Sequence, residues 1–214
     1  MILRLWATLT ALIIGMQITK KGEPPKPPFF LVANHLSYLD VVPLWRYLDG
    51  TFVAKSEIKS WPFFGWATQT LGVLFIDRAH KQDAYRMNNR IAETISNEQG
   101  VIIFPEGTST SGKQVLPFNA PLLAYPARNT MPVHFATVRY RSRYDRWPAH
   151  KHICWWGDMP FLPHFWELLK MPRFEVTISF GDYAVSESDR KQLAANLHHS
   201  VAQNFDPIEN PQKR

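Results

Sequence analysis

Apolar positions along the chain alternate between two spacings, and this alternation predicts an α/β domain. Short, continuously apolar runs predict strands at residues 13–20, 29–33, 51–54, 72–76, 101–104, 132–140, 152–156 and 174–180. Longer segments with apolar residues three and four apart predict helices at residues 2–12, 38–47, 61–70 and 80–98. The capping box Ser186-x-x-Asp189 predicts the start of a last helix. We therefore expect a single layered α/β domain with a mixed central sheet flanked by helices.

The same pattern sets the expected domain boundaries. Residues 1–12 form a short apolar helix that either packs on the core or lies in a bilayer interface. Residues 13–205 form the folded domain, and the polar, proline-broken residues 206–214 form a frayed tail. The 15 uncharged residues between Arg4 and Lys20 are fewer than the roughly 20 that a spanning helix needs, and no good signal-peptide cleavage site follows them.

Composition narrows the class of protein. Hydrophobic residues make up 45% of the 214 positions and charged residues only 20%, which is typical of a folded core rather than of a disordered chain. The 24 Lys and Arg residues against 18 Asp and Glu give a net charge of +6, so an anionic partner is expected: nucleic acid, anionic lipid or an acidic protein. Cys154 is the single cysteine, which excludes an intrachain disulfide.

Residues 34–40, Asn-His-Leu-Ser-Tyr-Leu-Asp, follow a predicted buried strand and contain a candidate acid–base pair. Histidine is the natural general base near neutral pH, and a carboxylate on its second ring nitrogen supports that role. Positions five apart on one helix lie about 140° apart. His35 and Asp40 can therefore pair only if His35 precedes the helix and Asp40 lies in its first turn. Alternatively, Asp40 only caps the helix, three residues after Ser37.

A second polar segment, residues 104–112, follows the predicted strand at 101–104. It combines one carboxylate and one glycine with several hydroxyls, beginning with Glu106, Gly107, Thr108 and Ser109. Backbone N–H groups and hydroxyls in such a turn can hold the hydroxyls or phosphate of a ligand, or the segment can be a solvated turn.

A third polar segment, Asp77-Arg78, follows the strand at 72–76. Arginine suits a bidentate grip on phosphate or carboxylate, whereas the alternative is an ordinary surface ion pair. Ligands of such sheets bind beyond the carboxyl ends of the strands, so polar groups at two or three strand ends point to one site.

Taken in order, these segments resemble the glycerolipid acyltransferase family, whose best-known members are the 1-acylglycerol-3-phosphate (lysophosphatidate) acyltransferases. Four motif blocks of that family match residues 34–40, 75–78, 104–108 and 131–133. The resemblance covers at least residues 29–138.

The resemblance implies direct acyl transfer, with His35 as the general base on an acceptor hydroxyl and Asp40 orienting it. It assigns acceptor binding to five residues: Arg78, Glu106, Gly107, Thr108 and Ser109. It assigns supporting roles to three more: Asn34, Ser37 and Pro132. No metal and no cofactor are implied, and the donor is acyl-CoA or an acylated acyl carrier protein. Because members work at membranes, we expect peripheral attachment to anionic lipids on the cytoplasmic face, and no nucleic acid.

One position departs from the family pattern. Ser109 stands where many phosphate-using members carry an arginine, and loss of that donor weakens phosphate binding by about 1–3 kcal/mol unless another cation replaces it. Lys113 and Arg128 are candidate replacements. Lysophosphatidate remains the first predicted acceptor, and another lysolipid, such as a lyso-ornithine lipid or a lysophospholipid, is the alternative.

Two rival functions use other residues. A hydrolase would form an acyl-enzyme on Ser37 or Cys154. A binding module without catalysis would use residues 139–152, whose five Lys and Arg residues, one acid and interleaved aromatics suit lipid head groups, an acyl donor or nucleic acid, or form a solvated hairpin. His150, His152 and Cys154 would share one face of a strand, but no second ligand pair accompanies them, so we predict no metal site.

Overall fold

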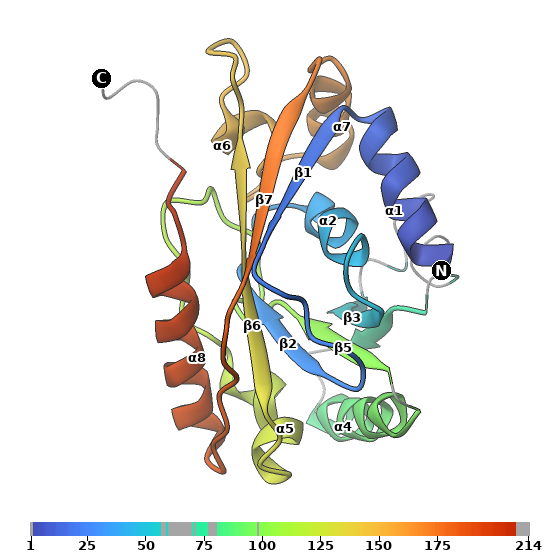
Figure 1. Cartoon of the computed structure of the whole chain (residues 1–214), viewed down its shortest axis with the longest axis vertical. Coiled ribbons are helices and arrows are strands. Elements are labelled where there is room, and N and C mark those ends of the chain that lie inside the picture. Colours follow the sequence, from blue (N-terminus) through green and yellow to red (C-terminus); the bar gives the residue numbers. More distant parts are fainter. Residues whose placement is uncertain are drawn as a thin grey trace.

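The computed structural model describes residues 2–56, 59, 70, 72–76, 81–97 and 99–208, with only the backbone described at 81–85. Within these residues one mixed sheet has the strand order β1-β7-β6-β2-β5-β3-β4 (Figure 1). Its strands are β1 (Met16–Lys21), β2 (Phe30–Ala33), β3 (Gly50–Lys55), β4 (Leu74–Ile76), β5 (Gly100–Ile103), β6 (Val133–Arg141) and β7 (Phe174–Phe180). All neighbouring strands are parallel except β6 and β7, which confirms the predicted mixed sheet.

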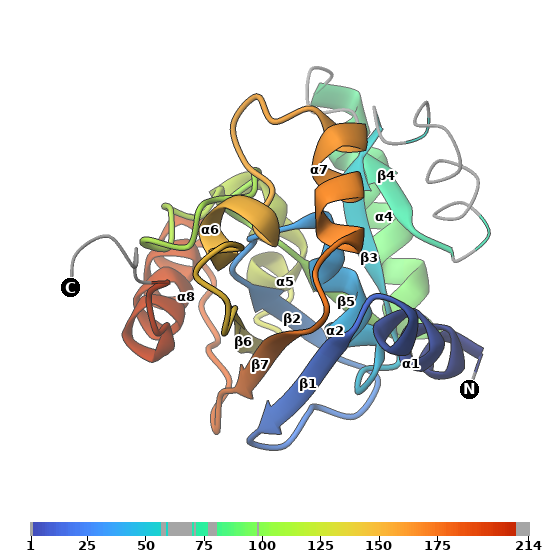
Figure 2. The ribbon, with the colours of Figure 1, turned by 90° about the horizontal axis from the view of Figure 1, so that it is seen from above.

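Helices cover both faces of this sheet (Figure 2). The elements are α1 (Ile2–Ile13), the 3-10 turn η1 (Tyr38–Asp40), α2 (Val41–Trp45), α4 (Lys81–Ser96), η3 (Ala120–Leu123), α5 (Ala124–Arg128), α6 (Ala149–His152), α7 (Phe161–Leu169) and α8 (Arg190–Asn204). Helices α1 and α2 pack together on one face, and α4, α5 and α8 lie on the other. None of the described helices is long and apolar enough to cross a membrane.

Most predicted elements are confirmed, with shifts at their ends, and one is wrong. Residues 152–156 do not form a strand, because α6 ends at His152 and an irregular segment follows. Ile153 and Cys154 are nevertheless fully buried, so the apolar pattern reported burial correctly and the conformation incorrectly. His150, His152 and Cys154 therefore share no strand face. The helix predicted at 61–70 lies outside the described residues apart from Thr70.

The last helix has a different cap from the predicted Ser186-x-x-Asp189 box. The Asp189 side chain accepts hydrogen bonds from the N–H groups of Lys191 and Gln192, so Asp189 itself is the N-cap of α8. At the other end, the chain stays packed past residue 206, where the frayed tail was expected to begin. Ile208 is buried, and its N–H group donates to the Gly112 carbonyl.

The length of β6 creates the wall of the candidate site. Strand β2 pairs with β5 on one side and with the first half of β6 on the other, and its last residue, Ala33, is opposite Ala136. Strand β6 continues to Arg141, beyond the end of β2. The segment that follows β2 is therefore flanked by the loop after β5 on one side and by residues 137–141 on the other.

Candidate active site

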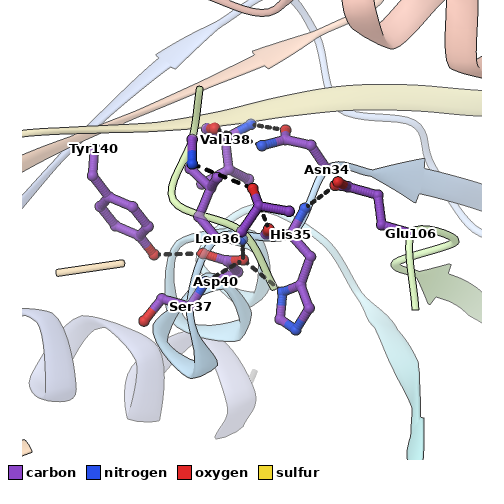
Figure 3. Close-up of polar contacts among 10 residues, drawn as sticks. Asn34, His35, Leu36, Ser37, Asp40, Glu106, Val138 and Tyr140 are labelled. Atoms are coloured by element: carbon purple, nitrogen blue, oxygen red, sulfur yellow. Dashed lines mark hydrogen bonds and ion pairs between the residues drawn. The ribbon is translucent and has the colours of Figure 1, made fainter. Parts of the chain in front are cut away.

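Asn34 fastens the start of the polar turn to β6 (Figure 3). Its side-chain Oδ1 accepts a hydrogen bond from the Val138 N–H at 2.7 Å, and its Nδ2 donates to the Val138 carbonyl at 3.0 Å. Asn34 is buried. The side-chain amide thus satisfies the Val138 N–H and carbonyl, which a further residue of β2 would otherwise bind. The backbone from His35 onward is therefore free to turn away from the strand.

His35 and Asp40 form the pair that their spacing suggested. His35 Nδ1 lies 2.8 Å from Asp40 Oδ2, with His35 in the turn before η1 and Asp40 as the last residue of η1. The Asp40 side chain is fully buried and the His35 side chain is 23% exposed. In the described part of the chain His35 Nε2 has no hydrogen-bond partner, so this nitrogen is free to face a substrate.

The Asp40 carboxylate also performs the capping role that was the alternative explanation. Its Oδ2 accepts hydrogen bonds from the N–H groups of Leu36 at 2.7 Å and Ser37 at 3.1 Å, as well as from His35. Its Oδ1 accepts a hydrogen bond from the Tyr140 hydroxyl at 2.8 Å. A buried carboxylate is tolerated when donors surround it in this way. Asp40 therefore both pairs with His35 and caps the turn.

Tyr140 is a site residue that the sequence analysis missed. It lies on β6, 100 positions after Asp40, and is buried. Burial raises the pKa of its hydroxyl, and the charge of Asp40 raises it further, so the group stays protonated and donates. The only signal in the sequence is a tyrosine inside an apolar strand, whose buried hydroxyl must find a partner.

Glu106, which the resemblance assigns to acceptor binding, also holds two loops together. Its Oε1 accepts the His35 N–H at 2.7 Å and its Oε2 accepts the Leu116 N–H at 2.7 Å. Burial raises the pKa of Glu106 to about 7, against the lowering effect of these two N–H groups. The Thr110 N–H donates to the His35 carbonyl at 2.9 Å, so both backbone groups of His35 are bound by the 104–112 segment.

The ring of His35 is also held in its plane. It stacks on Phe104, at the end of β5, with ring centroids 4.2 Å apart and an interplanar angle of 11°. The backbone N–H of Trp155 donates to the Leu36 carbonyl at 2.9 Å, which attaches the segment after α6 to the same turn. The imidazole is therefore fixed by a stacked ring and a carboxylate before any substrate arrives.

The other residues predicted to bind the acceptor differ in how they lie relative to the catalytic turn. Gly107 has a φ of +77°, the left-handed region that favours glycine, and Thr108 is exposed to solvent. Ser109 is buried and lines a cavity of about 380 Å³. Arg78 lies outside the described residues.

Pro132 is not near the catalytic turn. It precedes Val133, which pairs with the first residue of β2, whereas the catalytic turn follows the last. The whole length of β2 separates the two. Helix α5, whose last residue is Arg128, lies near this same end of β2 (Figure 1).

The two candidate nucleophiles of a hydrolase are poorly placed. The Ser37 Oγ is buried without a hydrogen-bond partner among the described residues, and it points away from the His35 ring (Figure 3). Cys154 is fully buried, and burial together with the Asp40 charge raises the pKa of its thiol. A protonated, inaccessible thiol is a weak nucleophile. Across the described residues, no three His, Cys, Asp or Glu side chains gather where they could hold a metal ion.

Comparison with known proteins places this geometry in a family. The family model described as Acyltransferase matches residues 16–140, more than half of the chain. The chain belongs to the acyltransferase family. The matched span contains the whole constellation described above, from Asn34 to Tyr140.

Relatives of this acyltransferase agree with that assignment. The lyso-ornithine lipid O-acyltransferase of Pseudomonas aeruginosa is 31% identical over 199 residues, which cover 92% of this chain and 76% of that protein. The 1-acyl-sn-glycerol-3-phosphate acyltransferase of Neisseria meningitidis serogroup B is 30% identical over 196 residues, 90% of this chain and 75% of that protein. The crystal structure of the 1-acyl-sn-glycerophosphate acyltransferase PlsC from Thermotoga maritima has the same fold, with a TM-score of 0.65, 19% identity and coverage of 97% and 80%.

Proposed function

We propose that this acyltransferase moves a fatty acyl group from a thioester of coenzyme A or acyl carrier protein directly to a free hydroxyl of a lysolipid. The observation that carries the proposal is the His35–Asp40 pair, in which Nδ1 is bound to the carboxylate and Nε2 is left without a partner in the described chain. That arrangement suits a general base, because the carboxylate keeps the Nδ1 proton in place and stabilises the imidazolium that forms.

The proposed step balances without any other reactant. His35 Nε2 takes the proton of the acceptor hydroxyl as its oxygen attacks the thioester carbonyl carbon. The carbon–sulfur bond then breaks, and the leaving thiolate takes the proton back from the imidazolium. The products are an oxygen ester and a free thiol. No cofactor enters the step, since the thioester itself carries the activated acyl group.

Two acceptors are candidates within this reaction. The first is 1-acylglycerol-3-phosphate, which the motif blocks suggest and which the names of the Neisseria meningitidis and Thermotoga maritima proteins contain. The second is a lyso-ornithine lipid, as in the name of the Pseudomonas aeruginosa relative. Ser109 favours the second, because a buried hydroxyl replaces the arginine with which many family members hold a phosphate.

Direct transfer is favoured over an acyl-enzyme by the burial of Ser37 and Cys154. Mass spectrometry of the chain after mixing with acyl donor alone separates the two mechanisms. Direct transfer predicts an unchanged mass. A covalent acyl adduct would overturn it.

We also propose peripheral attachment to the cytoplasmic face of a membrane with anionic lipids. One face of α1 carries large apolar side chains that are 50–81% exposed: Ile2, Leu5, Leu9, Leu12 and Ile13. An unpartnered apolar face of this kind is typical of a helix that lies in a bilayer interface, and the net charge of +6 adds attraction to anionic lipids. The basic segment 139–152 contributes less than its composition suggested, because Arg139 pairs with Asp206 and Arg143 pairs with Glu175.

The test of the reaction is an activity screen with labelled acyl-CoA and acylated acyl carrier protein against lysophosphatidate, lyso-ornithine lipid and other lysolipids. The native chain should acylate at least one of them. His35→Ala and Asp40→Asn should remove or strongly reduce that transfer while circular dichroism and melting behaviour stay close to those of the native chain. Full activity in a folded His35→Ala variant would refute the mechanism.

A further inference from the structure

A groove of about 380 Å³ opens beside the catalytic turn. We call it the head-group groove and define it by six of the residues that line it: Ser109, Thr110, Ser111, Lys113, Gln114 and Trp156. The reaction as proposed above uses none of these side chains except through the predicted role of Ser109. The groove therefore needs an explanation of its own.

Backbone hydrogen bonds attach both walls of the groove to the catalytic turn. On one wall, Thr110 donates to the His35 carbonyl, and Glu106 joins the His35 N–H to that of Leu116, which also lines the cavity. On the other wall, the backbone N–H of Trp155, the neighbour of Trp156, donates to the Leu36 carbonyl. A molecule seated in the groove is thus held against the same short segment that carries the general base.

The lining favours a compact anionic group. It offers three hydroxyls, one amide and one ammonium, beside the apolar surface of Leu116 and of the Trp156 indole. Lys113 is the charged residue among those that line the cavity, and no carboxylate accompanies it. An ammonium with hydroxyl and amide donors around it is a suitable set for one phosphate or one carboxylate.

The position of Lys113 is set by a rigid turn. The preceding residue, Gly112, has a φ of +82°, and a side chain there would meet Ile208 at 2.6 Å. The Ile208 N–H also donates to the Gly112 carbonyl at 2.8 Å. The end of the described chain therefore closes against this turn and fixes where the lysine begins.

A second feature lies behind the Trp156 side of the groove. The indole N–H of Trp156 donates to the carbonyl of His150, a buried residue. The Nδ1 atom of His150 is buried without a hydrogen-bond partner among the described residues. Burial lowers the pKa of His150, and the charges of Lys151 and Lys113 lower it further.

We infer that the head-group groove binds the polar head of the lysolipid acceptor, with Lys113 paired to the anionic phosphate or carboxylate of that head. The inference rests on the proposed function and deepens it. It explains how the chain can hold an anionic acceptor although Ser109 carries no charge. The groove's volume is near the lower end of the range for ligand pockets, about 300–1,000 Å³. A compact head group fits that size, whereas the carriers of the acyl donor are larger.

The test separates acceptor from donor binding in the full chain. Lys113→Gln is compared with Arg128→Gln, a matched loss of one exposed cation at the other end of the strands. Steady-state rates are measured with lysophosphatidate, with lyso-ornithine lipid and with a neutral monoacylglycerol, each against acyl-CoA. Lys113→Gln should raise KM for the anionic acceptor about tenfold or more, because a charge-assisted hydrogen bond is lost. The kcat, the KM for acyl-CoA and the rate with the neutral acceptor should change little, and Lys113→Arg should recover most of the affinity.

The outcomes distinguish the possible errors. The anionic acceptor whose KM responds identifies the source of the anion as phosphate or carboxylate. A rise in KM for acyl-CoA instead would assign the groove to the donor and overturn the inference. Equal effects of Lys113→Gln and Arg128→Gln, or none, would also overturn it while leaving the proposed function intact. A native chain that acylates no lysolipid would refute the proposed function, and this inference with it.

Discussion

The Tyr140 hydroxyl donates a hydrogen bond to Asp40 Oδ1 at 2.8 Å, between two side chains that are both shut off from solvent. Asp40 uses its other oxygen for His35. The orientation of the imidazole thus depends on a residue of β6 whose hydroxyl binds Asp40 and not the imidazole ring itself. Tyr140 is a positioning residue, which acts on the reaction through Asp40.

Tyr140→Phe removes this hydroxyl and leaves Asp40 Oδ1 without its donor. We expect kcat to fall about tenfold or more, since an unsatisfied buried carboxylate oxygen costs about 1–3 kcal/mol and the carboxylate can then rotate. KM for donor and acceptor should stay within about twofold. In an Asp40→Asn background the same change should have no further effect on kcat, because its route of action is gone. Additive losses in the double variant would contradict a role through Asp40.

Glu106 should make stability depend on pH. Its pKa is raised to about 7 in the folded chain, against an ordinary value of 4.5, so the folded state binds this proton more tightly than the unfolded state. The free energy of unfolding should therefore fall as pH rises from about 4.5 to about 7, by up to about 3 kcal/mol from this group. Urea denaturation at several pH values, compared with Glu106→Gln, measures the contribution.

In Glu106→Gln the decrease in stability between pH 4.5 and pH 7 should be smaller than in the native chain. Glu23→Gln is the matched control, because Glu23 is exposed and pairs with Lys20 at the surface. Its pH dependence should match that of the native chain. Equal slopes in the native chain and Glu106→Gln would show that Glu106 titrates alike in the folded and unfolded states.

Asn34→Ala should destabilise the fold at the junction of β2 and β6. It removes both hydrogen bonds to Val138 and leaves a buried N–H and a buried carbonyl unsatisfied, at a cost of about 3 kcal/mol. Asn129→Ala is the control, since that exposed side chain donates one hydrogen bond to the Tyr125 carbonyl and its loss should cost under about 1 kcal/mol. Equal midpoints of chemical denaturation for both variants would contradict this account.

The exposed face of α1 can be tested without touching the core. Replacing Leu5, Leu9 and Leu12 together by Gln should reduce binding to vesicles of anionic lipid at least tenfold, because each buried leucine contributes about 1.5–3 kcal/mol at most. The melting temperature should stay near that of the native chain, since the three side chains contact solvent. Flotation of the vesicles at low and high salt measures both contributions to binding, apolar insertion and charge attraction. Attachment that disappears in high salt but survives the triple substitution would assign it to charge alone.

Local patterns predicted much of the fold and the central pair of the site. Buried strands were recognisable because apolar runs such as Phe30–Ala33 reflect burial directly. His35 and Asp40 were recognisable because residues 34–40 match the first motif block of the family. Their spacing of five only set the condition under which they meet. The same reasoning failed at Ile153 and Cys154, which are buried in an irregular segment, because an apolar run reports that a segment is buried and not how its backbone is folded.

The sequence by itself determined the α/β class, the strand ends with polar residues and the candidate base with its carboxylate. Only the tertiary structure decided what holds them: Val138 on Asn34, Tyr140 on Asp40, and Glu106 on the His35 backbone. These partners lie 104, 100 and 71 positions apart in the chain. Their meeting depends on the order and register of β2, β5 and β6, and on β6 extending past β2. No local pattern carries that information, because it arises when separate strands pair.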